Sequence, residues 1–479
     1  MSLFLGAQTF AQQALPVYYQ IFVRSFADAD GDGIGDIKGI ISKLDYLQEL
    51  GIKGLWLTPV HPSSTYHKYD IKDYKSIDPE YGTIDDYKML VAEAHKRGIN
   101  ILLDLVVNHT SSEHPWFEES VKNHPTYKNY YVWRFDTLSN KNWYGNLRNP
   151  QEKYYAFFWE RMPDLNFDNT LVREEVKQIG KYWLSQIGVD GFRVDAAQHV
   201  YDADDIESNN RWWKEFGDAM KSVKPNVFII GEVWNKDSVV ATYLKSGMNS
   251  CFNFDLSKLI TSAVQDGKDP GLVQRLSTIH QLYKKTEPSF VDAIFISNHD
   301  QDRYRSTFGG DEWKTKQAFA ILMTLPGMPF VYYGEEIGML GKFPDEYRRE
   351  PFLWTESKND NTFWEIPRYS NSSTVKPLSQ QMSESQSYYT YYKNMIAFRN
   401  KYPMLSNSSV VPTKQIATSN ELIAYELHYD KQKVLVIHNV GKLPVELGKL
   451  VSKKVLMANK LEGKKLGANG SVVIALSGL

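Results

Sequence analysis

Short, continuously apolar runs alternate with amphipathic stretches along most of the chain. Residues 54–60 (GLWLTPV) and 101–109 (ILLDLVVNH) are apolar at nearly every position, as expected of parallel strands buried on both faces. Residues 36–50 and 83–98 carry apolar side chains at helical spacing, and Gly51 is placed to end the first of these segments. This alternation predicts a parallel sheet whose strands are joined by helices.

The same pattern recurs often enough to close a barrel. Strands are predicted at 16–26, 54–60, 101–109, 188–195, 227–232, 251–256, 293–300 and 329–336. Helices are predicted at 36–50, 83–98, 170–187, 209–223, 271–285, 315–325 and 387–400. Eight strands alternating with helices predict an α/β fold, a closed (β/α)8 TIM barrel built from residues 1–107 and 170–402.

Two segments depart from this rhythm. Residues 108–169 contain no clear strand–helix unit and are rich in aromatic residues, Asn and Pro, so we expect an inserted domain overhanging the barrel mouth. Residues 403–479 instead show alternating strands, which predict a C-terminal antiparallel β-sandwich. Its strands are expected at 422–429, 433–439 and 471–476, with Asn469-Gly470 as a hairpin signal.

Composition narrows the function. The 479 residues include 55 Lys+Arg and 57 Asp+Glu, a net charge of −2, which argues against an electrostatically held nucleic-acid partner. The single cysteine, Cys251, excludes an internal disulfide framework and a cysteine-rich zinc site. No apolar run reaches the roughly 18 residues of a membrane span. We expect a monomer.

The N-terminus leaves the compartment open. Residues 1–13 have a short apolar start and an A-x-x-x-A stretch, but they lack the positive region and the length of a signal peptide. Two interpretations remain. Residues 1–13 are either the trimmed end of a signal peptide, which indicates a secreted or cell-envelope protein, or an ordinary tail, which leaves a cytoplasmic location as the alternative.

Three of the predicted strands end in a carboxylate: Asp195, Glu232 and Asp300. A single acid there would be explained as a helix cap or a loop residue, but three such ends predict acids converging at the barrel mouth. Retaining cleavage of a glycosidic bond needs a carboxylate nucleophile and a carboxylic acid about 5–5.5 Å apart. Arg193, two residues before Asp195, points to the same side of its strand and is expected to keep that acid ionised.

The chain resembles the α-amylase family of glycoside hydrolases over nearly its whole length. The motifs occur in the family's order: DLVVNH (104–109), GFRVDAAQH (191–199), GEVW (231–234), FISNHD (295–300) and LPGMPFVYYGEEIGM (325–339). MPDLN (162–166) resembles a signature of the subgroup intermediate between oligo-1,6-glucosidases and neopullulanases.

This resemblance implies a role for each matching residue. It implies Asp195 as nucleophile, Glu232 as general acid/base and Asp300 as the residue that holds hydroxyls of the distorted sugar ring. The residues that it implies around the substrate are Tyr69, His109, Arg193, His299, Asp345 and Arg349.

The expected activity is endo-acting hydrolysis of α-1,4 bonds in starch and maltooligosaccharides. Ala196 follows the implied nucleophile where α-1,6-specific relatives tend to carry Val, and a small side chain leaves room for an α-1,4-linked partner sugar. Gln198 stands where many α-amylases have Lys, which leaves the balance of hydrolysis and glycosyl transfer open. An α-glucosidase, a neopullulanase-like hydrolase and a transglycosylase are the enzymatic alternatives. A sugar-binding scaffold barrel is the non-enzymatic one, although such barrels usually lose an acid.

A second candidate site is the acidic loop DADGDGIGD at 28–36. Its oxygen ligands fall at EF-hand-like spacing, although Gly39 stands where the usual bidentate Glu would be. The alternative is a solvated turn whose last acid caps the next helix. Because four acids within nine residues repel one another without a counter-ion, we expect Ca²⁺ here, bound by Asp28, Asp30, Asp32, the Ile34 carbonyl and Asp36.

Overall fold

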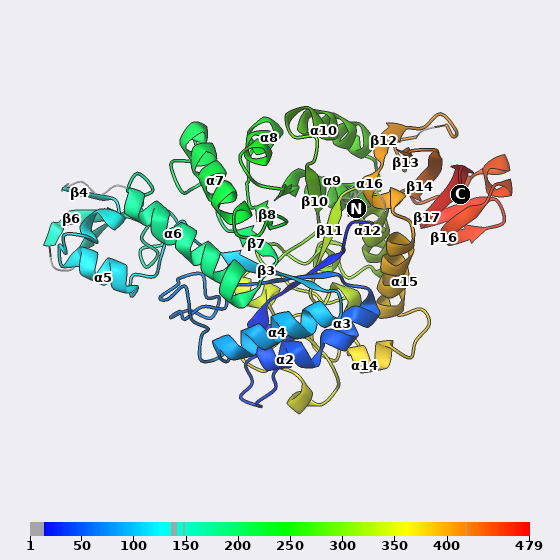
Figure 1. Cartoon of the computed structure of the whole chain (residues 1–479). Coiled ribbons are helices and arrows are strands. Elements are labelled where there is room, and N and C mark those ends of the chain that lie inside the picture. The colour runs from blue at the N-terminus through cyan, green and yellow to red at the C-terminus, as the bar shows by residue number, and fades with distance from the viewer. Residues whose placement is uncertain (1–13, 136–140, 147–148, 418) are drawn as a thin grey trace, which may run out of the picture.

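A computed structural model describes residues 14–135, 141–146, 149–417 and 419–479. Eight parallel strands form a closed barrel in the order β1-β11-β10-β9-β8-β7-β3-β2, which confirms the predicted TIM barrel (Figure 1). The strands are β1 Tyr18–Ile21, β2 Gly54–Leu57, β3 Asn100–Leu105, β7 Gly191–Val194, β8 Phe228–Gly231, β9 Ser250–Phe252, β10 Val291–Ile294 and β11 Met328–Tyr332.

Long helices surround the barrel at six of the predicted places and at two further ones, 237–245 and 254–266, the second of which begins within the strand predicted at 251–256. They are α4 Ile84–Lys96, α6 Thr170–Tyr182, α7 Ile206–Lys221, α8 Asp237–Lys245, α9 Phe254–Asp266, α10 Leu272–Thr286, α12 Glu312–Thr324 and α15 Tyr388–Lys401. The shorter helices are α1 Val23–Phe26, α2 Ile37–Ser42, α3 Leu44–Leu50, α11 Tyr304–Thr307, α13 Asp345–Arg348, α14 Leu378–Gln381 and α16 Met404–Asn407.

Local chemistry explains several boundaries. Thr83 and Asp86 form a reciprocal capping box at the start of α4, and Gly51 ends α3 with a left-handed φ of 94°. The segment predicted as one helix at 36–50 is two, because α2 ends at Ser42 and α3 begins at Leu44. The first strand is also shorter than predicted, since Val23–Phe26 turn into α1.

The barrel interior is filled by large side chains rather than by a pore. Tyr18, Trp56, Phe252 and Phe330 are buried in one cluster along the axis, with Trp56 and Phe252 ring centroids 5.2 Å apart. A larger apolar layer between the strands and the surrounding helices makes up the main core. This packing holds the strand ends in fixed positions, which is what a site at the mouth requires.

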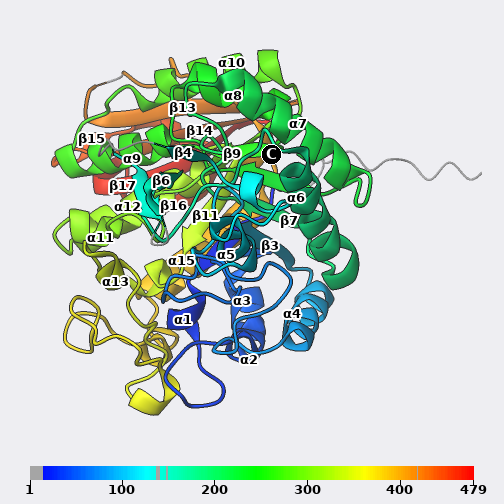
Figure 2. The same cartoon turned by 90° about the vertical axis from the view of Figure 1, so that its left-hand side faces the viewer.

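The insertion forms a small lobe over the carboxyl ends of the strands, as Figure 2 shows. It contains α5 Pro115–Val121 and a three-stranded antiparallel sheet of β4 Trp133–Phe135, β6 Asn149–Tyr155 and β5 Trp143–Asn146, in that order. An isolated bridge between His109 and Asp164 connects this lobe to the segment that leaves β3, and a second bridge joins Tyr131 and Leu165 within the lobe.

The C-terminal strands are antiparallel, as predicted, and form one six-stranded sheet. Tyr425 and Val436 on one face join the main core, whereas Leu435 and Ile474 on the other face belong to a separate cluster. The strands are β12 Ser409–Pro412, β13 Leu422–Tyr429, β14 Gln432–Asn439, β15 Val445–Glu446, β16 Val455–Glu462 and β17 Lys465–Ser477.

The hairpin predicted at Asn469-Gly470 is wrong. Both residues lie inside β17, where Asn469 has a φ of 56°, and the turn between β16 and β17 lies at Gly463, with a φ of 58°. A register shift in the β16–β17 pairing accompanies this distortion, so the Asn-Gly pair marks an irregularity within the strand rather than its end.

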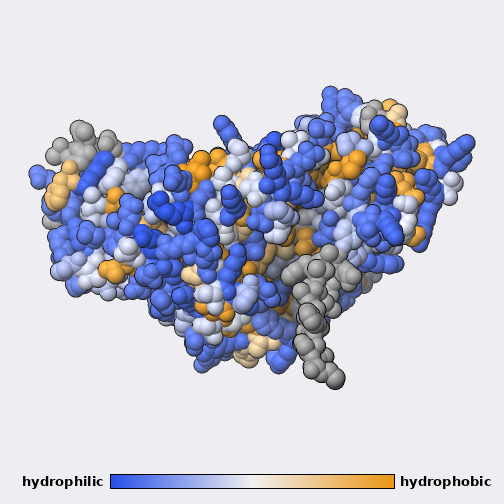
Figure 3. Space-filling view, turned by 45° about the horizontal axis from the view of Figure 1, so that its top comes forward, coloured by the Kyte–Doolittle hydropathy of each residue, from blue (hydrophilic) through white to orange (hydrophobic). Residues whose placement is uncertain are grey.

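The face seen in Figure 3 is mainly hydrophilic, with small and separate hydrophobic groups. Within the part of the chain that the structure describes, no helix combines the length and hydrophobicity needed to cross a bilayer. Residues 1–13, on which the signal-peptide interpretation depends, lie outside the described part.

Candidate active site

The three strand-end acids face one cleft. Asp195 follows β7, Glu232 follows β8, and Asp300 lies beyond β10, so the parallel barrel brings them to the same end. All three line a cleft of about 550 Å³. The side chains of Asp195 and Glu232 are only 11% and 13% exposed, whereas that of Asp300 is 38% exposed. This geometry supports the acid roles implied by the sequence, which stay predictions.

One buried guanidinium connects the acids. Arg193 is 1% exposed; its Nη1 donates to Asp195 Oδ1 at 2.8 Å and its Nη2 donates to Glu232 Oε2 at 2.5 Å. Nη1 also donates to Asp104 Oδ1 at 2.8 Å. Arg193 therefore lies behind the cleft, where it fixes the two carboxylates relative to each other.

Asp104 is a site residue that the sequence analysis did not single out. Its carboxylate is fully buried and also accepts hydrogen bonds from Trp56 Nε1 at 3.0 Å and from the Tyr69 hydroxyl at 3.1 Å. The β3–β7 register places it directly beside Arg193. Burial raises the pKa of Asp104 to about 6 against the opposing effect of Arg193. A carboxylate within the apolar run ILLDLVV was the available signal.

The electrostatics of Asp195 differ from the sequence expectation. Burial raises the pKa of Asp195 well above its usual range, and the nearby charges of Glu232 and Asp104 act in the same direction. Arg193 opposes this shift, as expected, but does not cancel it. One guanidinium cannot neutralise three carboxylates, so the buried cluster favours keeping a proton.

His299 is a neutral residue beneath the cleft. Its Nδ1 lies 2.7 Å from Gln20 Nε2, so Nδ1 accepts a hydrogen bond and Nε2 carries the proton. Nε2 lies 2.6 Å from the Tyr69 hydroxyl and 3.2 Å from Asp300 Oδ2. Burial, with the charges of Arg349 and Arg193, lowers the pKa of His299 well below its usual range.

Arg349 holds the outer acids. Its Nη2 donates to Asp300 Oδ1 at 2.9 Å and to Asp345 Oδ2 at 3.3 Å, and its Nη1 donates to the Tyr66 hydroxyl at 3.0 Å. Asp345 begins the short helix α13, and its side chain is 43% exposed at the cleft wall. Asp345 and Arg349, two of the implied substrate contacts, therefore lie together with Asp300 at the cleft wall.

The remaining wall comes from the insertion and from β7 and β8. His109 lies beside Phe158 at 5.5 Å between ring centroids, and burial lowers the pKa of His109 to about 4. Lining residues that the sequence analysis did not assign to the site are His67, Phe158, Trp159, Met162, His199 and Trp234; Ala196 and Gln198, which it considered for specificity, also line the cleft. The aromatic richness of residues 108–169 was the signal for the rings, but it could not say which of them face the cleft.

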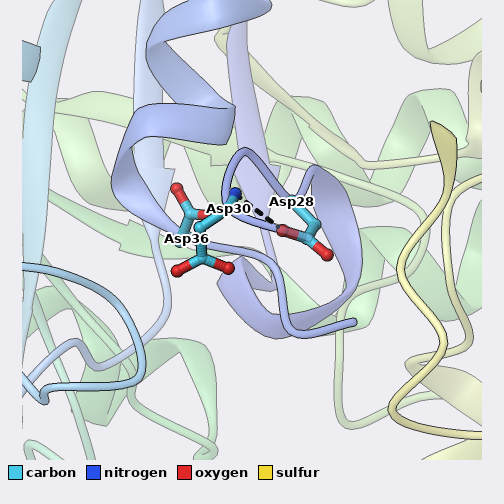
Figure 4. Close-up of side chains that lie close together, drawn as sticks. All are labelled: Asp28, Asp30 and Asp36. Atoms are coloured by element: carbon cyan, nitrogen blue, oxygen red, sulfur yellow. Dashed lines mark hydrogen bonds between the residues drawn. The ribbon is translucent and has the colours of Figure 1, made fainter. Parts of the chain in front are cut away.

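The acidic loop lies apart from this cleft and shows features of both interpretations. Asp36 caps α2 by accepting from Gly39 N at 2.8 Å, and Asp28 accepts from Gly31 N and Gly33 N at 2.7 Å each. Carboxylate oxygens of Asp28, Asp30 and Asp36 nevertheless lie within 4.8 Å of one another (Figure 4). Asp32 is outside this group and accepts from Ile34 N at 2.7 Å.

Comparison with known proteins agrees with this geometry. Residues 20–408 match the family model for the alpha amylase catalytic domain. The chain belongs to the alpha-amylase family. It is 46% identical to Alpha-amylase 3 of Dictyoglomus thermophilum over 432 residues, covering 89% of this chain and 85% of that protein. The fold and the strand-end acids therefore belong to a glycoside hydrolase of this family.

Other family members differ in their reported reactions. The chain is 34% identical to a 4-alpha-glucanotransferase of Thermotoga neapolitana, covering 88% of this chain and 95% of that one. Among solved structures, the alpha-amylase from H. orenii superposes with a TM-score of 0.86 at 37% identity, covering 97% of this chain and 99% of that one. Membership of the alpha-amylase family therefore does not decide whether the cleaved chain is passed to water or to another sugar.

Proposed function

We propose that this protein is a retaining, endo-acting α-amylase that hydrolyses α-1,4 bonds of starch and maltooligosaccharides. The observation that carries this proposal is the bridging of Asp195 and Glu232 by Arg193 at the floor of an open cleft. One guanidinium that binds both carboxylates keeps them close together, which supports the short separation that a double displacement needs.

In the first step, the Asp195 carboxylate attacks the anomeric carbon while Glu232 gives its proton to the glycosidic oxygen. The C–O bond breaks, the shortened glucan leaves as an alcohol, and the sugar is held on Asp195 as an ester. In the second step, Glu232 takes a proton from water, whose oxygen attacks the same carbon and releases Asp195. Asp300 and Arg349, joined at 2.9 Å, hold hydroxyls of the distorted ring.

Two features favour long α-1,4-linked chains. Ala196, beside the nucleophile, has a small side chain, so little protrudes toward the partner sugar. Its backbone N–H donates to Glu232 Oε2 at 3.2 Å. Exposed rings of Phe158 and Trp159 extend the cleft wall beyond the acids, where they can stack on further sugars. The likeness to a glucanotransferase makes glycosyl transfer the second candidate reaction.

Product analysis tests the proposal. Wild type should cut maltoheptaose at internal bonds, and chromatography should show mid-length products with retained anomeric configuration. Terminal glucose alone would indicate an α-glucosidase, and products longer than seven sugars would indicate a transferase. Asp195→Asn should abolish turnover without altering the circular dichroism spectrum, and full residual activity in that variant would refute the proposed roles.

We also propose Ca²⁺ at the acidic loop. The oxygens of Asp28, Asp30 and Asp36 converge closely enough for one hard cation, which prefers such ligands, and the Ile34 carbonyl and Asp32 are the further donors within the loop. Burial and the charges of Asp30 and Asp28 raise the pKa of Asp36, as expected of acids crowded without a cation. A bound Ca²⁺ would neutralise these charges and stabilise the loop.

A further inference from the structure

Lys68 adopts a backbone conformation that few residues with a side chain take. It lies in the loop between β2 and α4, within the sequence YHKYD at 66–70. Its φ is 65°, in the left-handed region, where a Cβ comes too close to the following carbonyl oxygen and Gly is the usual residue. Such a conformation persists only where the surrounding structure enforces it, and residues of this kind gather at functional sites.

The residues on either side of Lys68 face the cleft, whereas Lys68 does not. His67 and Tyr69 both line the cleft of the strand-end acids. The Tyr69 hydroxyl lies 2.6 Å from His299 Nε2 and donates to Asp104 at 3.1 Å. Lys68 instead lines a separate hollow of about 490 Å³. The left-handed turn at Lys68 is therefore the point at which the chain directs two neighbouring rings into the site.

The Lys68 ammonium is buried and paired. Its side chain is 4% exposed, and Nζ lies 2.8 Å from Asp78 Oδ2 and 2.6 Å from Glu80 Oε2. Arg24 Nη1 donates to the same Glu80 oxygen at 2.8 Å, so two cations face two carboxylates. Removing one partner from a buried ion pair leaves a charge uncompensated, which costs far more than the loss of an exposed pair.

The acid that lies deepest in this set is itself fixed. Asp78 Oδ2 accepts from Ser63 N at 3.1 Å, and Asp78 Oδ1 accepts from Glu80 N at 3.0 Å. The backbone N–H of Asp78 donates to the Val60 carbonyl at 2.8 Å, just beyond the end of β2. The lysine ammonium is thus held at a place that is tied to the barrel.

We propose that Lys68 is a positioning residue of the active site. Its ion pairs with Asp78 and Glu80 hold the backbone in the left-handed turn, and this turn directs His67 and Tyr69 into the cleft. The ion pairs offset the cost of the left-handed Cβ, so the loop is arranged before the substrate arrives. This inference rests on the proposed function, in which the cleft binds the sugar whose bond is cut.

Two substitutions at this position separate the backbone from the ammonium. Lys68→Gly removes the ammonium but adopts the left-handed turn freely, whereas Lys68→Ala removes the ammonium and keeps the Cβ. We expect kcat/KM for maltoheptaose to fall about tenfold or more in Lys68→Gly, because Asp78 and Glu80 lose a partner. It should be about tenfold lower again in Lys68→Ala, because the left-handed region costs a Cβ roughly that factor.

Two further measurements separate positioning from a loss of folded protein. KM for maltoheptaose should rise in both variants, whereas an unfolded fraction would lower kcat alone. Tyr69→Phe removes the hydroxyl that the turn places beside His299 and Asp104. The loss caused by Lys68→Ala should therefore be smaller in a Tyr69→Phe background than in wild type.

Lys460→Ala is the matched control. Lys460 lies in β16 of the C-terminal sheet and also has a left-handed φ, of 55°. This substitution removes a lysine with the same backbone conformation at a place far from the cleft in the fold. Its kcat/KM and KM for maltoheptaose should match those of wild type, and a loss equal to that of Lys68→Ala would contradict a role specific to the cleft loop.

The outcomes keep this inference apart from the proposed function. If wild type cleaves no α-glucan, the proposed function fails and this inference fails with it. If wild type is active and Lys68→Gly matches it, the ion pairs do not position the loop. Equal values of kcat/KM for Lys68→Gly and Lys68→Ala would refute the backbone role. An unchanged KM, or equal losses with and without the Tyr69 hydroxyl, would refute action through the cleft rings.

Discussion

At the scale of single residues, three acids of the site share one guanidinium. Arg193 donates to Asp104, Asp195 and Glu232, and each of these acids comes from a different strand or strand end. The cluster is therefore held together by hydrogen bonds but is not neutralised when all three acids ionise. The proposed double displacement needs one proton on this cluster, at Glu232 in its first step, while Asp195 is ionised.

The acidic limb of the pH profile follows from Asp195. The nucleophile must be ionised, and burial raises the pKa of Asp195, so kcat/KM for maltoheptaose should begin to fall at a pH above the usual Asp range, which centres near about 3.9. Asp104→Asn removes a charge that raises the pKa of Asp195 and frees Arg193 to favour its ionised form. The limb should then move to lower pH, and a limb that moves to higher pH would contradict this account.

At the scale of elements, sequence periodicity predicted the strands and helices well because each has a strong pattern and clear ends. Thr83 and Gly51, for example, mark helix boundaries by local hydrogen bonding alone. What failed depended on tertiary contacts: Asn469-Gly470 looks like a turn, yet β17 continues through it because both neighbouring strands pair with β17. Asp104 was missed for a related reason, since its role exists only beside Arg193.

The acidic loop is packed against a segment that supports the cleft. Phe363 N and Trp364 N donate to the Gly33 carbonyl at 2.8 and 3.1 Å, and the Phe363 ring occupies the space that a Cβ at Gly33 would need. Trp364 stacks on Tyr66 at 5.2 Å, and Tyr66 accepts from Arg349. A continuous set of contacts thus leads from the loop to the residue that holds Asp300.

Removing a loop cation should therefore affect both stability and substrate binding. Exhaustive chelation should lower the Tm and raise the KM for maltoheptaose, and calorimetric titration of the chelated protein with Ca²⁺ should show one binding event. Asp30→Ala should abolish that event, because it removes a proposed Ca²⁺ ligand. It should leave the fold intact, because the exposed Asp30 carboxylate accepts one long hydrogen bond, from Asp32 N at 3.2 Å. Asp204→Ala, at another exposed acid, should bind normally. Unchanged Tm and titration after chelation would rule out Ca²⁺ here.

Arg399 fastens α15 to the end of α12. It is fully buried and donates to the carbonyls of Met323, Leu325 and Gly327 at 2.7, 2.8 and 2.6 Å. Arg399→Met would leave three carbonyls without these donors, so we expect a loss of about 3 kcal/mol or more in the free energy of unfolding. Lys401→Met, at an exposed position of the same helix, should change it little. Equal losses in urea denaturation would contradict this role.

At the scale of the whole molecule, the barrel and the C-terminal sheet are joined by buried polar contacts as well as by apolar packing. Gln317 Nε2 donates to the Asn439 carbonyl at 2.6 Å, and the Tyr425 hydroxyl donates to Thr324 Oγ1 at 3.0 Å. The alternating pattern of the last strands predicted an antiparallel unit. It could not predict this junction, because the partners on α12 are distant in sequence and read as ordinary helix residues.

His438 makes this junction sensitive to acid. It lies between Thr324 and Ser471, and burial lowers its pKa to about 3. Between that value and about 6.5 the unfolded chain binds this proton and the folded one does not, so stability should fall by about 1.4 kcal/mol per pH unit below 6.5. Other buried groups titrate too, so the test is a difference: His438→Gln should lose ~2 kcal/mol less than wild type between pH 7 and pH 5 in urea denaturation. His124→Gln, at an exposed position, should follow wild type, and parallel curves for all three proteins would show that His438 does not govern the junction.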